Sequence, residues 1–208
     1  MKLSPINQIE LYGFEDYFFE FIKLIEENKL PNKILLSGQK GLGKATFSYH
    51  LINYVLSSNE EFKYDNKNLV IHPENHSFKT VVNKSNPNFI LIDVEKDKKS
   101  IDIDQIRKLI LNLNKSSLNN KPKFVLIDNI DLLNIFTVNA LLKVMEEPSN
   151  NISFLLIHNS DSRIAETLKS RCINFKLKLD NSFTEVIVNN YFKANLLNEL
   201  SSQLKHYS

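Results

Sequence analysis

The chain has 208 residues, of which 42% are hydrophobic and 24% are charged, and it carries a formal net charge of +2. This length and composition predict a globular protein of one domain with a small appendage, and the near-neutral charge does not by itself indicate a nucleic-acid-binding surface. A single cysteine excludes an intrachain disulfide. The lack of a secretory signal or a membrane-spanning apolar run predicts a cytoplasmic protein without a membrane partner.

The first part of the chain is predicted to hold helices around one strand. Apolar residues at three- and four-residue intervals predict one or two helices over residues 7–30, interrupted near Gly13. An apolar run predicts a strand at 33–37, followed by a helix. Residues 58–86 are polar and weakly periodic, which predicts a surface insertion in which residues 69–71 pair only marginally.

The rest of the chain alternates between predicted strands and helices. Strands are predicted at 89–94, 124–128, 152–157 and 173–177, and helices at 104–113, 134–147 and 161–170. Asp104 is predicted to cap the first of these helices. The alternation predicts an α/β fold with a five-stranded parallel sheet and helices on both faces. Residues 181–206 are predicted to be helical and to begin a second module.

A glycine-rich stretch between the first strand and its helix has the sequence of a phosphate-binding loop. Its candidate binding residues are Gly38, Gly41, Gly43, Lys44, Ala45 and Thr46. Glycines let successive backbone N–H groups point into one concavity, and the helix start adds partial positive charge. The ammonium group of Lys44 would then reach the terminal phosphates of a nucleotide. The alternative reading of this stretch is a glycine-rich turn that binds nothing.

Two positions lack the groups that a hydrolysing enzyme of this kind uses. A Ser or Thr hydroxyl normally follows the lysine and holds Mg²⁺, but here the residue is Ala45, and Thr46 lies about 100° further round the helix. Asp128 ends a buried strand and is a candidate Mg²⁺ ligand, but Asn129 follows it where a Glu general base is usual. The loop is therefore expected to bind ATP and Mg²⁺ weakly or not at all.

Two more polar residues are candidates because of their positions. Asn159 follows the predicted strand at 152–157, where P-loop proteins often place a side chain near the γ-phosphate. Arg171 ends a predicted helix and is one of only three arginines against 23 lysines, which favours a use that needs the planar guanidinium. A plain surface cation is the alternative for Arg171.

Four stretches together resemble the AAA+ subunits of bacterial sliding-clamp loaders. They are Gly-Gln-Lys-Gly-Leu-Gly-Lys-Ala-Thr at 38–46, Val-Leu-Ile-Asp-Asn-Ile-Asp at 125–131, Asn-Ala-Leu-Leu-Lys-Val-Met-Glu-Glu-Pro at 139–148 and Leu-Lys-Ser-Arg-Cys at 168–172. Within this family they are most similar to delta-prime subunits of DNA polymerase III. The resemblance implies an AAA+ domain over residues 1–178 and the start of a helical lid over residues 179–208, with a C-terminal collar domain missing.

The resemblance also implies a role and partners. The family forms a hetero-pentamer, here with gamma/tau-like and delta-like subunits, which loads a sliding clamp onto primer-template DNA. Arg171 matches the arginine that the family inserts into a neighbouring subunit's ATP site, as an arginine finger in trans. Ala45 and Asn129 fit a delta-prime subunit with an eroded site of its own. The chain is therefore expected not to be catalytic alone.

One departure from the family predicts that no zinc is bound. Many family members bind zinc through a cysteine cluster after the first helix, but residues 51–90 contain no cysteine, and His72 and His76 cannot make a tetrahedral site alone.

Other functions stay open from the sequence. The chain could instead be an active P-loop ATPase of the gamma/tau type or a small nucleotide kinase that uses Lys44 and Asp128, or an interaction scaffold with an empty loop. The lysine run at 96–99 is read as a solvated turn, with direct DNA contact left open.

Overall fold

The computed structural model describes residues 4–113, 121–146 and 151–179. Its centre is one sheet with the strand order β2-β3-β4-β1-β5. The strands are β1 (Lys33–Gly38), β2 (Phe89–Ile92), β3 (Lys123–Ile127), β4 (Ile152–Asn159) and β5 (Ile173–Lys176). All four neighbouring pairs are parallel, which confirms the predicted five-stranded parallel sheet.

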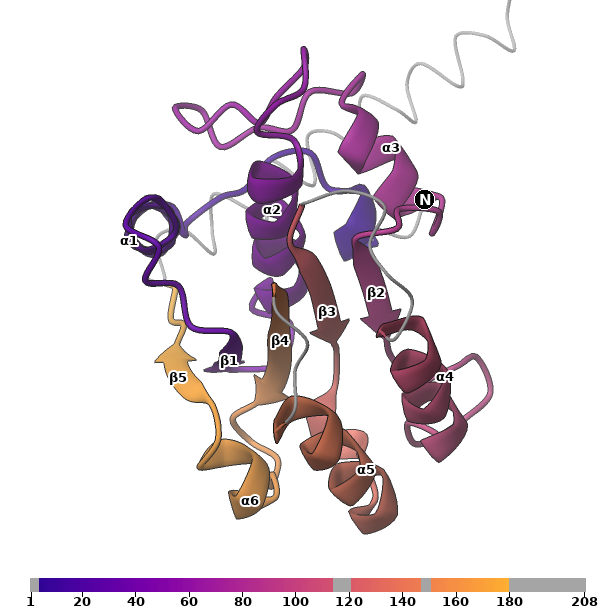
Figure 1. The fold of residues 1–208 in the computed structure, drawn as a ribbon. Helices are drawn as coiled ribbons and strands as arrows, with labels where there is room; N and C mark the ends of the chain where they lie inside the picture. Colours follow the sequence, from indigo (N-terminus) through magenta and orange to yellow (C-terminus); the bar gives the residue numbers. More distant parts are fainter. Residues whose placement is uncertain (1–3, 114–120, 147–150, 180–208) are drawn as a thin grey trace, which may run out of the picture.

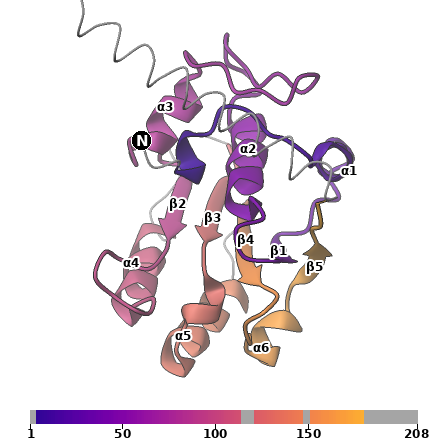
Figure 2. The same cartoon turned by 180° about the vertical axis from the view of Figure 1, so that it is seen from behind.

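Helices cover both faces of the sheet (Figures 1 and 2). The α-helices are α1 (Glu15–Glu26), α2 (Lys44–Leu56), α3 (His76–Val82), α4 (Ile103–Leu113), α5 (Ile135–Glu146) and α6 (Glu166–Lys169). Two short 3-10 helices lie at Pro5–Asn7 and Ile130–Leu132. The core residues of α1, α2 and α3 belong to one apolar cluster, and those of α4, α5 and α6 belong to the other.

The strands separate these two cores because successive side chains point to opposite faces of a sheet. In β1, Ile34 and Leu36 enter the first cluster and Leu35 enters the second. The ring of Phe47 on α2 is at the centre of the first cluster and is fully buried. Three other rings surround it with centroid distances of 5.3 to 5.9 Å, those of Phe14, Phe18 and Phe21. This aromatic cluster fixes α1 and the segment before it against α2.

The amino-terminal region forms one of the one or two helices predicted over residues 7–30, with the predicted interruption at Gly13. Only α1 forms within residues 7–30, because Gly13 takes a left-handed φ of 76° two residues before the helix begins. The irregular segment before it is hydrogen-bonded to the insertion, by Leu11 N to Leu69 O at 3.1 Å and Ile71 N to Ile9 O at 2.8 Å. This pairing supports one edge of a pocket described below.

The insertion is more structured than the sequence pattern indicated. Leu69 and Ile71 are buried in the first core, which corrects their predicted surface position. Helix α3 was not predicted. It begins at an Asn75 cap whose side-chain oxygen accepts a hydrogen bond from Phe78 N at 2.7 Å. A helix of only 7 residues has too little apolar periodicity for the sequence to show it.

Two helix boundaries also need correction. Asp102, not Asp104, caps α4, because Asp102 Oδ1 accepts from Asp104 N at 3.1 Å while Gln105 Oε1 accepts from Asp102 N at 3.0 Å. The helix predicted at 161–170 is shortened to α6, because a turn after β4 occupies its first residues. The prediction of a second helical module at 181–206 lies outside the described residues.

Replacing the buried Phe47 with Ala is expected to lower the free energy of unfolding by about 3–5 kcal/mol, because the cavity would lie among three other rings. Phe136→Ala is the matched control, since that ring is 73% exposed, and its effect should stay within about 0.5 kcal/mol. Urea denaturation followed by circular dichroism measures both. Equal losses in the two variants would contradict the assigned core.

Candidate functional site

The glycine-rich loop has a backbone shape that only glycine accepts readily. Gly41 and Gly43 have φ values of 80° and 97°, in the left-handed region. At Gly38 the constraint is space, since an added Cβ would lie 2.7 Å from the backbone oxygen of Leu177. The loop leads directly into α2, whose first residue is Lys44. The predicted strand, loop and helix are therefore all present.

The side chain of Lys44 folds back onto the loop and is hydrogen-bonded to its main chain. It is only 4% exposed. Its Nζ donates to Gly38 O at 2.9 Å, to Gln39 O at 2.6 Å and to Asn159 Oδ1 at 3.2 Å. Burial lowers the pKa of Lys44, and the charges of Asp128 and Asp131 partly offset this shift. The ammonium group is thus held at the loop by two main-chain carbonyls and one side chain.

The predicted Asn159 lies at this site because of strand register. It is the last residue of β4 and pairs with Gly38 of β1. While its oxygen accepts from Lys44, its Nδ2 donates to Asp131 Oδ1 at 3.3 Å. Asn159 therefore connects the loop lysine to a carboxylate that the sequence analysis did not select. The spacing Asp-x-x-Asp at 128–131 was the available signal for Asp131.

Asp128 and Asn129 follow β3, beside the end of β2. Asn129 has a left-handed φ of 56°, and its Nδ2 donates to Asp93 Oδ1 at 2.9 Å. Burial raises the pKa of Asp128 to about 6, and the nearby charge of Asp93 adds to the shift, while a hydrogen bond from Asn129 N opposes it. Asp93 was also missed, although it was the one charged residue in the strand predicted at 89–94.

The residues present fit a nucleotide better than they fit its metal. The loop conformation, the helix start and Lys44 suit phosphate oxygens. The methyl group of Ala45 packs against the first core and supplies no oxygen for Mg²⁺, while Thr46 faces a pocket beside the loop. Among the described residues, no three His, Cys, Asp or Glu side chains lie close enough together to hold a metal ion. The absence of zinc stays a prediction.

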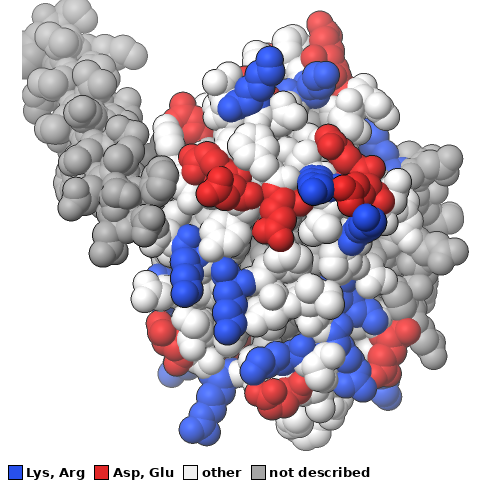
Figure 3. Space-filling view, turned by 90° about the vertical axis from the view of Figure 1, so that its left-hand side faces the viewer, with Lys and Arg blue, Asp and Glu red and all other residues white. Residues whose placement is uncertain are grey.

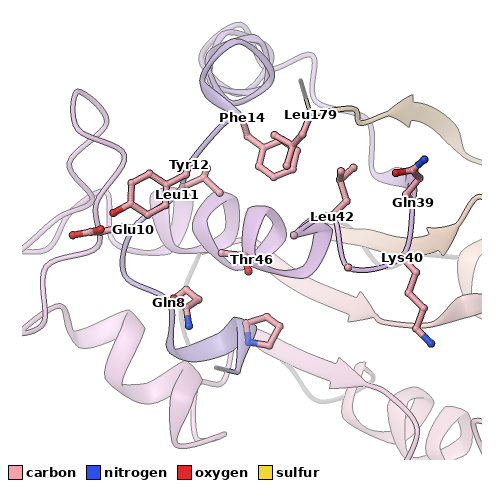
Figure 4. A pocket seen from close by; sticks show the side chains of 13 residues that line it. Gln8, Glu10, Leu11, Tyr12, Phe14, Gln39, Lys40, Leu42, Thr46 and Leu179 are labelled. Carbon is pink, nitrogen blue, oxygen red and sulfur yellow. The ribbon is translucent and has the colours of Figure 1, made fainter. Parts of the chain in front are cut away.

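A pocket of about 510 Å³ extends from the loop (Figure 4). It is lined by Pro5, Gln8, Glu10, Leu11, Tyr12, Phe14, Gln39, Lys40, Gly41, Leu42, Gly43, Thr46 and Leu179. Its wall away from the loop comes from the irregular segment before α1, which had been predicted as helix. An apolar pocket joined to a phosphate loop has room for the base and sugar of a nucleotide. The pocket residues outside the loop were not selected from the sequence, since no local motif marks them.

Arg171 lies toward the amino-terminal ends of the strands, whereas the glycine-rich loop lies at their carboxyl ends. It precedes β5, whose first residue Ile173 pairs with Ile34 near the start of β1, whereas the loop follows the end of β1. The strand residues between Ile34 and Gly38 span roughly 13 Å. Arg171 Nε donates to Glu146 Oε1 at 2.8 Å, and its Nη1 donates to Thr167 O at 3.0 Å. The structure thus brings all the other predicted site residues together and leaves Arg171 apart from them.

The sheet order, the glycine loop and the polar strand ends define a P-loop protein of the AAA+ class. The family described as "DNA polymerase III, delta subunit" matches residues 15–181. The chain belongs to this family.

Curated relatives agree with this assignment. The delta′ subunit of DNA polymerase III from Buchnera aphidicola subsp. Baizongia pistaciae is 29% identical over 151 residues, which cover 70% of this chain and 44% of the relative. The delta′ subunit from Buchnera aphidicola subsp. Schizaphis graminum is 28% identical over 191 residues, which cover 91% of this chain and 56% of the relative. The chain thus spans about half the length of these relatives, and the predicted delta-prime resemblance is confirmed.

A solved structure supports the fold. The gamma subunit-related protein of DNA polymerase III from Thermotoga maritima superposes with a TM-score of 0.54 at 19% identity, covering 84% of this chain and 49% of that one.

Replacing Asp128 with Asn is expected to stabilise the protein at pH 7 by about 1–3 kcal/mol, because it removes a partly buried charge. The pKa of Asp128 is about 6 in the folded state, above the 3.8 of a free side chain, so the folded state binds this proton more tightly. The protonated Asp128 side chain therefore favours the folded state, and this contribution to the free energy of unfolding is fully present below pH 4 and is lost as the pH rises through 6. The advantage of the Asp128→Asn variant over the native protein should therefore disappear at pH 4.

Urea denaturation at pH 4 and pH 7 measures this difference. A pH-independent effect of Asp128→Asn would show that charge burial is not its cause.

Ala45→Thr is expected to make nucleotide binding depend on Mg²⁺, because it restores a hydroxyl at the first turn of α2. Titration with a fluorescent ATP analogue, with Mg²⁺ or with EDTA, should show at least threefold tighter binding with Mg²⁺ in this variant and little difference in the native protein. Ala45→Val has the same shape without the hydroxyl and is the control. The same Mg²⁺ dependence in both variants would exclude ligation by the hydroxyl.

Proposed function

We propose that the protein is a delta-prime-type subunit of the DNA polymerase III clamp loader, and that it supplies Arg171 to a neighbouring subunit's ATP while contributing little hydrolysis itself. The observation that carries this proposal is the position of Arg171. Its side chain is 40% exposed at the sheet edge opposite the loop, so it is open to another molecule and remote from this chain's own nucleotide site.

The geometry of the candidate site supports a non-catalytic role for the loop. Asn129 occupies the position of the usual general base, but an amide cannot take a proton, and its Nδ2 is bonded to Asp93. Ala45 supplies no ligand to a metal. The loop and its pocket can still hold a nucleotide, which would stabilise the subunit by binding the folded state.

The partners follow from the family. We infer gamma/tau-like and delta-like subunits as neighbours, because relatives of this chain include gamma and delta′ subunits of DNA polymerase III. The sliding clamp and primer-template DNA would be met through the assembled complex, in the cytoplasm. On the face that carries β5 and α6, basic side chains alternate with acidic ones (Figure 3), so this face offers DNA no continuous basic surface.

Two further observations concern DNA and membranes. Lys98 in the lysine run is paired with Glu95 and Asp102 at 2.7 and 3.2 Å, as expected for a solvated turn. Among the residues that the structure describes, no helix is long and apolar enough to cross a membrane.

The test is the Arg171→Ala variant of the protein, reconstituted with its loader partners and assayed for DNA-stimulated ATP turnover. Turnover is expected to fall at least threefold, because removing an arginine finger costs the affected site most of its transition-state stabilisation. Arg107→Ala is the control, since Arg107 is also exposed and pairs only with Asp104 of its own helix in the described contacts. Unchanged turnover in an intact complex, or brisk hydrolysis by this chain alone, would defeat the proposal.

A further inference from the structure

The guanidinium group of Arg171 is held by two elements of its own chain. Glu146, the last residue of α5, accepts from Nε at 2.8 Å. The main-chain oxygen of Thr167 in α6 accepts from Nη1 at 3.0 Å. The sequence separation between Glu146 and Arg171 is 25 residues, so this contact depends on the packing of α5 beside α6.

These contacts leave part of the group free. A guanidinium has five N–H donors in one plane, and the two contacts use one on Nε and one on Nη1. Both donors of Nη2 and the second donor of Nη1 have no partner among the residues that the structure describes. These are the donors at the tip of the side chain, which can engage two phosphate oxygens in parallel. The side chain is therefore anchored through Nε and one donor of Nη1, while Nη2 is open among the described contacts.

We propose that Glu146 is a positioning residue, which holds Arg171 in the orientation that reaches a neighbouring subunit's nucleotide. This inference rests on the proposed function of Arg171. A long, exposed side chain otherwise samples many rotamers, and fixing one of them beforehand reduces the entropy that must be lost when the phosphates are engaged. Among the described contacts Glu146 meets Arg171 at Nε, so its proposed effect acts through the arginine.

The opposite role, a latch that keeps Arg171 away from the neighbour, fits the contacts less well. The ion pair is half exposed on both sides, 40% at the arginine and 49% at the glutamate, and such pairs are too weak to hold a group back against a phosphate. The second contact is to a helical carbonyl, which has no alternative charged partner and moves only with α6. Contacts on Nε and Nη1, with none on Nη2 among the described residues, favour orientation.

The test uses Glu146→Ala in the reconstituted loader, with ATP turnover measured against ATP concentration. We expect kcat to fall at least threefold while KM changes less than twofold, because Arg171 acts on the transition state more than on ATP binding. Glu146→Gln should keep at least half of the native kcat, since its amide oxygen still accepts from Nε. Glu166→Ala removes a comparable exposed ion pair, with Lys169, and should have no effect.

A double variant separates positioning from a general structural effect. On an Arg171→Ala background, Glu146→Ala should cause no further loss, whereas a structural defect would add to it. A rise in kcat for Glu146→Ala would show a latch, and an unchanged kcat with Arg171→Ala still impaired would reject Glu146 while keeping the finger. If Arg171→Ala itself has no effect, the proposed function fails first. Complex assembly checked by gel filtration ensures that each variant is in the ring.

Discussion

The hydrogen bond from Lys44 to Asn159 depends on the pairing of β1 with β4, and it joins the loop to the rest of the candidate site. Register places Gly38 beside Asn159, so the lysine after the loop can reach an amide that is 115 residues away in the chain. The same amide reaches Asp131. A shift of one residue in this register would turn each side chain of β4 to the other face and separate these groups.

The parallel sheet also separates the two functional regions. Every strand ends at the same edge, so the glycine loop and the polar residues after β2, β3 and β4 gather there. The start of β5 lies at the other edge, and Arg171 just before it is kept away from its own chain's loop. Under the proposed function, a loop on one side and an arginine on the other would let neighbouring subunits of a ring complete each other's sites. Glu146 would then orient the side chain of Arg171 toward the neighbouring subunit.

The candidate nucleotide site is an acidic edge in which Ala45 and Asn129 stand where a hydrolysing enzyme of this kind usually has a hydroxyl and a Glu. Among the carboxylates that follow β2 and β3, Asp131 accepts a hydrogen bond from Asn159 and Asp93 accepts one from Asn129, while Asp128 is partly buried and its pKa is raised to about 6. A negative charge on a partly buried carboxylate is unfavourable unless a cation lies close to it. The lost hydroxyl at position 45 removes one of the groups that would help bring Mg²⁺ there.

The sequence by itself determined the strands, the loop, and the absence of a hydroxyl and a general base, because each of these follows from residue types at fixed spacing. Period-two and continuous apolar runs identify buried strands, and a glycine pattern before a helix identifies the phosphate loop. The tertiary structure alone decided what lies beside these motifs. Asp93 against Asn129, the pocket wall from the segment before α1, and Glu146 against Arg171 all join residues far apart in the chain, and only packing brings such residues within hydrogen-bonding distance.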